Sequence, residues 1–166
     1  MATQTEIYGW FKDYLDRKEY NYKPDDENNI IKTGMSLDGK LSSTSIHIVC
    51  GDEHVVVFAY IQPDADEKSR ASVMEYLTRV NSNLKNGGFD LDLDDGEICF
   101  KQYLCCIDRT SLSDDLIDLT IAAPCYLYEY YGDGLLAVMF GMKTPEEALD
   151  EILQSTDDCC SCGCDH

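Results

Sequence analysis

The chain has 166 residues, enough for one domain with a complete hydrophobic core. Hydrophobic residues make up 44% of it, which is typical of a globular protein and too high for a disordered one. The net charge is −19, and the 13 Lys and Arg residues do not cluster. This charge argues against binding to nucleic acid or to an anionic membrane surface. It could steer basic partners toward the protein, or it could serve only to keep the protein soluble, and the sequence favours the second interpretation.

No stretch of the sequence predicts a membrane or secretion segment. The longest apolar run, from His54 to Ile61, is far shorter than a transmembrane helix requires. The first residues, MATQTEIYGWF, do not combine a basic stretch with an apolar run. We therefore expect a cytoplasmic protein.

The first segment predicts an amphipathic helix that Thr3 or Thr5 can cap. Its apolar residues recur at helical spacing and are Ile7, Trp10, Phe11, Tyr14 and Leu15. The following KPDDEN segment, residues 23–28, contains Pro and an acidic run and is expected to be a loop.

Three strands are expected next, over residues 29–37, 43–50 and 54–62. The third is apolar at both its even-numbered and its odd-numbered positions, so both faces of the strand are apolar. It should therefore be central and covered on both sides. If helices cover only one side, the other side must meet a partner protein. The candidate protein-binding residues are Val55, Val57, Phe58 and Tyr60.

Two histidines, His47 and His54, flank the turn between the second and third of these strands. They could face each other as metal ligands, or they could be two ordinary surface imidazoles. The sequence favours the second interpretation, because no third ligand stands nearby.

A second helix is expected from the acidic segment 64–67 to the glycines at 87 and 88, with Val73, Leu77, Val80 and Leu84 on its apolar face. Residues 89–93 alternate and lead through Asp94-Asp95-Gly96 into a strand containing Ile98, Phe100 and Leu104.

The C-terminal part predicts helices. Ser113 caps the first of them, whose apolar positions are Leu116, Leu119, Ala123, Leu127 and Tyr130. Pro124 should kink or split this helix, and Gly132-Asp133-Gly134 should separate it from a short helix over residues 135–140. Thr144-Pro145-Glu146-Glu147 matches a capping box for a last helix.

These elements predict an α+β fold in the order α-β-β-β-α-β-β-α, with helices packed on one antiparallel five-stranded sheet. Residues 1–156 form the single expected domain, and residues 157–166 form an acidic, Cys-rich tail.

The tail holds soft ligands for a metal ion. Its candidate ligands are Cys159, Cys160, Cys162, Cys164 and His166, which suit Zn²⁺ or Cu⁺. Their spacing is tighter than that of structural zinc sites, so a thiolate cluster or a site shared between two subunits is easier to build than one tetrahedral centre. The alternative is a tail that binds no metal. The other five cysteines lie within strand or helix patterns and are expected to act as small core residues.

In its order of motifs the chain resembles the YbjN-domain family of small bacterial proteins. The matching segments are 76–81 (YLTRVN), 88–92 (GFDLD), 95–98 (DGEI), Leu112-Ser113, Tyr130-Tyr131 with Leu135-Leu136, and 141–148 (GMKTPEEA). The resemblance covers roughly residues 5–153. The sequence departs from the family pattern at Thr78, where Asn is expected, and in the Cys-rich tail.

This resemblance implies a fold like that of type III secretion chaperones, which often dimerise, and it carries no catalytic residues. We therefore expect a non-enzymatic protein, chaperone-like or regulatory of the sensory-transduction type, that forms a homodimer and binds a protein client. The alternative is a soft-metal-binding or thiol-redox accessory protein that acts through the tail.

Overall fold

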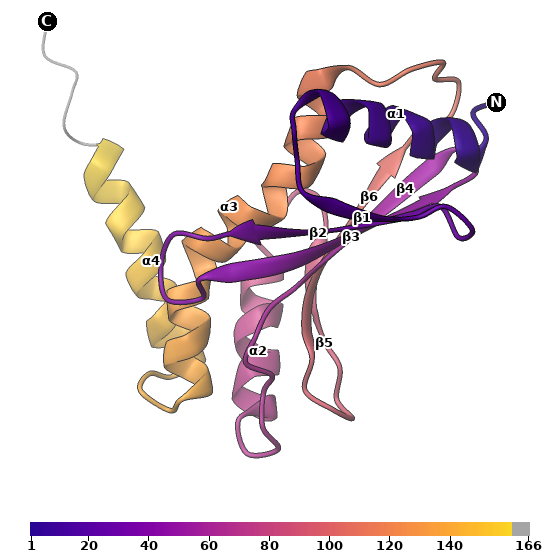
Figure 1. Cartoon of the computed structure of the whole chain (residues 1–166). Coiled ribbons are helices and arrows are strands. Elements are labelled where there is room, and N and C mark those ends of the chain that lie inside the picture. Colours follow the sequence, from indigo (N-terminus) through magenta and orange to yellow (C-terminus); the bar gives the residue numbers. More distant parts are fainter. Residues whose placement is uncertain (161–166) are drawn as a thin grey trace, which may run out of the picture.

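The computed structural model describes the backbone of residues 1–160 and the side chains of residues 1–155 (Figure 1). The elements are α1 (Gln4–Arg17), β1 (Tyr22–Asp25), β2 (Ile30–Ser36), β3 (Ser43–Gly51), β4 (His54–Tyr60), α2 (Arg70–Asn81), β5 (Gly88–Leu91), β6 (Ile98–Cys105), α3 (Asp114–Met139) and α4 (Pro145–Cys160). Within this part of the chain, no helix is long and apolar enough to cross a membrane.

The six strands form one antiparallel sheet in the order β1-β2-β3-β4-β6-β5. The expected α+β class and antiparallel pairing are confirmed, but the expected count of five strands is wrong. The additional strand is β1, at residues for which the sequence predicts a loop. Pro24 lies in it because β1 is an edge strand, where a missing backbone N–H is tolerated.

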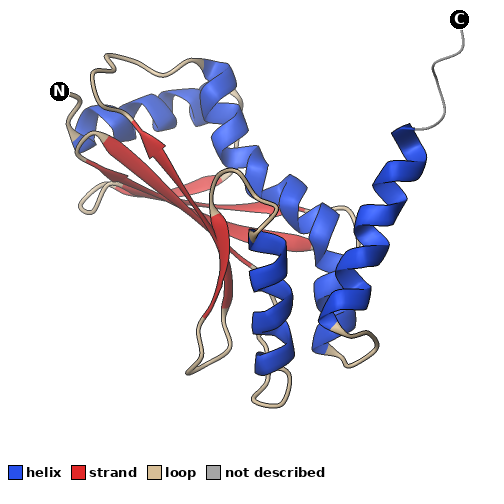
Figure 2. Ribbon diagram, turned by 180° about the vertical axis from the view of Figure 1, so that it is seen from behind, coloured by secondary structure: helices blue, strands red, loops and turns tan. Residues whose placement is uncertain are grey.

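All four helices lie on the same side of the sheet (Figures 1 and 2). Helix α1 covers β3 and β4, α3 crosses β4 and β6, and α2 packs against β5. Helix α4 rests on α2 and α3 rather than on a strand. The core therefore fills one face of the sheet, and the opposite face is left without a helix.

Helix α3 runs without interruption through Pro124 and through Gly132-Asp133-Gly134, so the predicted separation into two helices is wrong. The glycines serve close packing instead. A Cβ atom at Gly134 would lie 2.5 Å from Tyr76 Oη of α2 and 2.9 Å from Ile152 Cδ1 of α4. A Cβ atom at Gly132 would meet Leu41. These positions let α3 approach its neighbours.

The proline within α3 is accommodated by a side chain of β6. Because Pro124 has no backbone N–H, it cannot satisfy the carbonyl of Thr120, four residues earlier. The buried amide of Gln102 donates its Nε2–H to that carbonyl. The sheet thus completes the hydrogen bonding of the helix at this point.

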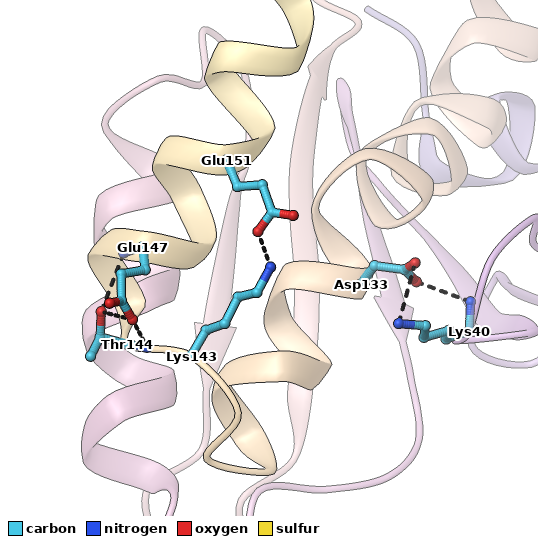
Figure 3. A network of polar contacts seen from close by, with 6 residues as sticks. All are labelled: Lys40, Asp133, Lys143, Thr144, Glu147 and Glu151. Carbon is cyan, nitrogen blue, oxygen red and sulfur yellow. Dashed lines mark hydrogen bonds and ion pairs between the residues drawn. The ribbon is translucent and has the colours of Figure 1, made fainter.

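The capping box predicted for the last helix is confirmed. Glu147 N–H donates to Thr144 Oγ1 over 3.3 Å, and Thr144 N–H donates to Glu147 Oε2 over 2.9 Å (Figure 3). The donation from Thr144 N–H, together with that from the Thr144 hydroxyl to the same Oε2 over 2.8 Å, holds the pKa of Glu147 below its ordinary value. The helix continues to Cys160, past residue 156, where the sequence places the end of the domain.

Candidate binding surface

The predicted binding residues of β4 divide between the two faces of the sheet. Val55 and Val57 are fully buried under the helices, where they belong to the core. Phe58 and Tyr60 point to the opposite face and are partly exposed. This division follows from strand geometry, because successive side chains point to opposite faces.

We call the helix-free side of the central sheet the open face. Its side chains come from β3, β4 and β6 and are Ser45, His47, Val49, His54, Val56, Phe58, Tyr60, Cys99, Lys101, Tyr103 and Cys105. In the register, Val56 lies between Val49 and Tyr103, and Phe58 lies between His47 and Lys101. Val49, Val56 and Tyr103 therefore form an apolar and aromatic row across three strands, and Phe58 lies beside it in a row that ends in His47 and Lys101.

Ring contacts join these rows into one surface. The rings of Phe58 and Tyr60 stack with their centroids 6.3 Å apart, and His47 lies 5.0 Å from the ring of Tyr60. His54 stacks on Tyr103 at 5.5 Å. The ammonium group of Lys101 lies 5.7 Å from the ring of Phe58, within the range of a cation–π interaction.

The open face is suited to binding another polypeptide, because aromatic side chains contribute large contact areas at the centres of protein interfaces. Tyr103 is the most accessible of its aromatic groups, at 54% exposure. Sequence reasoning missed Val49, Val56 and Tyr103. The alternation of β6 could have indicated Tyr103, because its neighbours Gln102 and Leu104 point toward the core.

The two histidines share the open face but do not form a site together. His47 pairs in register with Phe58, whereas His54 pairs with Gly51 and packs on Tyr103. Partial burial, together with nearby Lys32, lowers the pKa of His47 and favours its neutral form. No group of three potential metal-ligating side chains occurs in the described part of the chain.

The tail residues predicted to bind metal lie outside this description. Cys159 and Cys160 belong to the last turn of α4, but their side chains are not described. Cys162, Cys164 and His166 follow the last described residue. Of the other five cysteines, Cys50, Cys106 and Cys125 belong to the hydrophobic core, as expected. Cys99 is buried but lies on the side of β6 that faces away from the helices, and Cys105 is exposed, so the expectation is wrong for these two.

A cavity of about 410 Å³ lies between α3, α4 and the loop before β3. Its two lysines already face carboxylates: Lys143 bonds Glu151, and Lys40 Nζ lies 4.0 Å from Asp133 (Figure 3). The charges at this cavity are therefore balanced within the chain. Because its lysines are already paired, the cavity is better suited to holding α4 in place than to binding an anion.

No family model matches the sequence, and no curated protein matches it. Among solved structures, the chain is similar to YbjN of E. coli, for which a role as a transcription regulator has been suggested. The two share 10% sequence identity over 70% of this chain and 81% of YbjN, with a TM-score of 0.51. The chain also matches a chain of the HopA1–SchA chaperone–effector complex, with 17% identity over 85% of this chain and 97% of the other, at a TM-score of 0.46.

The similarity to YbjN confirms the fold that the sequence resemblance implies. At this level of identity it establishes the arrangement of helices and strands and nothing about activity.

Proposed function

We propose that this protein is a non-enzymatic binding protein, chaperone-like or regulatory, that holds a segment of a partner protein on its open face. The observation that carries the proposal is the one-sided placement of the helices, which leaves the rows around Phe58 and Tyr60 without cover. An apolar sheet face bordered by polar residues is a common form of protein interaction site.

The charge of the chain supports a basic partner. A net charge of −19 repels phosphate backbones, so a regulatory role of the kind suggested for YbjN would act here through contacts with protein rather than with DNA. Lys101 beside Phe58 adds a local positive charge, which can pair with a carboxylate of the partner.

The test compares capture of partners from a native lysate by three forms of the protein. The double variant Phe58→Thr/Tyr60→Thr removes two aromatic groups from the open face and keeps residues that favour strands. The matched control, Met74→Thr, changes an exposed apolar residue of α2 that lies away from the sheet. We expect the control to retain the partners of the wild type and the double variant to lose them; equal recovery by both would refute the proposal.

A homodimer is part of this proposal, with a second copy as one of the possible partners. Light scattering coupled to size-exclusion chromatography measures the mass directly. A mass twice that of the 18.7 kDa chain supports the dimer, and a single-chain mass across a broad concentration range contradicts it.

The alternative function, soft-metal or thiol-redox chemistry, rests on the sequence of the tail. Four thiols and an imidazole within eight residues provide ligands for Zn²⁺ or Cu⁺. Zinc titration of the reduced protein tests it, with the variant in which Ser replaces Cys159, Cys160, Cys162 and Cys164 as the control. Uptake at micromolar metal that disappears in this variant supports the alternative, and absence of uptake by the wild type rules it out.

A further inference from the structure

A groove of about 260 Å³ separates α3 from the second half of β6. Its helical wall is mostly apolar, with Leu116, Leu119, Ala123 and Leu127 around Thr120. Gln102, Tyr103 and Leu104 line the strand side, and Asn86 of the loop before β5 lies at its border. Gln102 and Thr120 are buried, whereas the apolar side chains and Tyr103 are partly or largely exposed, with Leu119 59% exposed. The groove is therefore an accessible, mostly apolar surface at the border of the core, against which Leu104 and Leu127 also pack.

Helix α3 carries two apolar faces, and only one of them is buried. The buried face contains Ile117, Ile121, Tyr128 and Leu135. The second face, at positions 116, 119, 123 and 127, has the spacing of a packed helix face, yet it borders the open groove. The sequence pattern thus predicts a packing partner that the described chain does not supply.

The strand that borders this groove has a free edge. Strand β5 pairs only with Ile98–Lys101, whereas β6 continues to Cys105. Cys106 N–H donates to Glu53 C=O over 2.7 Å, on the β4 side of the strand. Because backbone groups alternate along a strand, the N–H and C=O groups of Tyr103 and the N–H of Cys105 point to the opposite edge. No other described strand pairs with them.

We propose that an extended segment of a partner protein adds to this free edge of β6 as a short strand. The segment spans about three residues, matching residues 103–105, which lie beyond the end of the β5 pairing and beyond Gly87, whose position abuts Gln102. Side chains at alternate positions of the added strand point to the same face as Leu104, so they enter the groove and pack on Leu119 and Ala123. The occupant is therefore a segment with apolar residues at every second position.

The net charge of the chain indicates which residues the partner segment carries between its apolar positions. With a net charge of −19, the protein favours partners that carry Lys or Arg between and around the apolar residues. Tyr103 borders both this groove and the open face, but Leu119 belongs to the groove alone and Phe58 to the open face alone, so variants at these two positions test the two surfaces separately.

The probe is a fixed panel of fluorescein-labelled octapeptides in which Val, Ile, Leu or Phe alternates with Lys. Binding to the full chain is followed by fluorescence anisotropy at low salt. Each peptide has a matched form that is N-methylated at alternate backbone positions, which removes donors for strand pairing and keeps the side chains. We expect saturable binding of at least one unmodified peptide and at least about tenfold weaker binding of its methylated form.

Three variants of the protein locate the binding site. Leu119→Lys, in the groove, should weaken binding by about tenfold, as expected for the loss of a central apolar contact. Tyr126→Lys changes an equally exposed residue of α3 outside the groove and should leave the affinity within about twofold. Phe58→Thr, on the open face, should also leave it unchanged, which separates this proposal from the proposed function.

The proposal is overturned if no peptide of the panel binds saturably below about 1 mM. It is also overturned if the methylated peptides bind as well as the unmodified ones, or if Leu119→Lys and Tyr126→Lys weaken binding equally, because the occupant would then be bound by charge alone.

Discussion

Gln102 shows how one side chain of the sheet stabilises the longest helix. Its amide satisfies the Thr120 carbonyl that Pro124 leaves without an intrahelical donor. We predict that Gln102→Met, which keeps the length of the side chain and removes the donor, lowers the free energy of unfolding by about 1–3 kcal/mol. Urea unfolding followed by circular dichroism measures this change.

The control for this prediction is the same substitution in a Pro124→Ala background. Alanine at this position supplies the missing backbone N–H, so the Thr120 carbonyl no longer depends on the side chain of Gln102. In this background, Gln102→Met should lower the free energy of unfolding by clearly less than it does in the wild type. Equal costs in the two backgrounds would show that the hydrogen bond does not compensate for the proline.

The buried thiols make the stability of the protein sensitive to alkaline pH. Burial raises the pKa of Cys50 and of Cys99 to about 12 and that of Cys125 to about 11, from an ordinary value of 9.0. Above pH 9 these thiols ionise in the unfolded chain and stay protonated in the folded one, so the unfolded state binds fewer protons. The contribution of these thiols to the free energy of unfolding is therefore fully present below pH 9 and is lost as the pH rises toward 11–12.

Urea unfolding under reducing conditions at pH values from about 8 to 10.5 tests this sign. We predict that the unfolding midpoint falls with rising pH and falls less steeply in the Cys50→Val variant, which lacks one of the buried thiols. A midpoint that rises over this range, or an identical slope in the variant, would contradict the prediction.

At the scale of elements, the glycines of α3 act as contact points with neighbouring elements. A substitution of Gly by Ala inside a helix normally stabilises it by about 0.5–1 kcal/mol. We predict this gain for Gly9→Ala in α1, where no atom other than those of its chain neighbours and its own helix backbone lies within 4 Å of the added Cβ. For Gly134→Ala the close approach of Tyr76 and Ile152 should reverse the sign, with a loss of about 1–3 kcal/mol.

Thermal unfolding of both variants beside the wild type measures these opposite effects. If Gly134→Ala raised the melting temperature as Gly9→Ala does, the packing of α3 against α2 and α4 would be looser than the structure shows.

The same helix shows where sequence reasoning succeeds and where it fails. Its start at Ser113 follows from local hydrogen bonding, and the structure confirms it: Leu116 N–H donates to Ser113 Oγ. Its continuation through Gly132 and Gly134 depends on contacts with Leu41, Tyr76 and Ile152, which are distant in the sequence. Local patterns therefore predict how the element begins but not how far it extends.

Strand β1 is not predicted from the sequence, because it too depends on contacts with another element. Residues 22–25 have no strand pattern of their own and become a strand by pairing with β2, with Pro24 opposite Ile31. Pairing across the sheet outweighs local propensity here. The strands β2, β3, β4 and β6, which show alternation or long apolar runs, are predicted to within a few residues.

The sequence identifies the strand that carries the candidate binding surface but not its open side. Both faces of β4 are apolar, so nothing in the sequence of the strand distinguishes Val55 and Val57 from Phe58 and Tyr60. Helices that pack from one side only make the distinction (Figure 2). The contribution of Tyr103 depends on the register between β4 and β6, which local patterns do not specify.

At the scale of the whole molecule, the excess of negative charge opposes folding. A net charge of −19 on 166 residues produces self-repulsion in the compact state, and salt screens this repulsion. We predict that raising NaCl from about 20 mM to about 500 mM increases the melting temperature. A constant or lower melting temperature would show that surface ion pairs such as Lys12–Asp26 outweigh the repulsion.

The central claim is that the open face of the sheet is covered by another polypeptide in the cell. A photoreactive phenylalanine analogue, incorporated in place of Phe58, reports directly on what lies against this face, and the same analogue in place of the exposed Met74 of α2 is the control. We predict that irradiation of cells yields a discrete cross-linked product from position 58, either with a partner protein or with a second copy of the chain, and none from position 74. An absence of cross-linking at position 58, or equal cross-linking at both positions, would contradict the account.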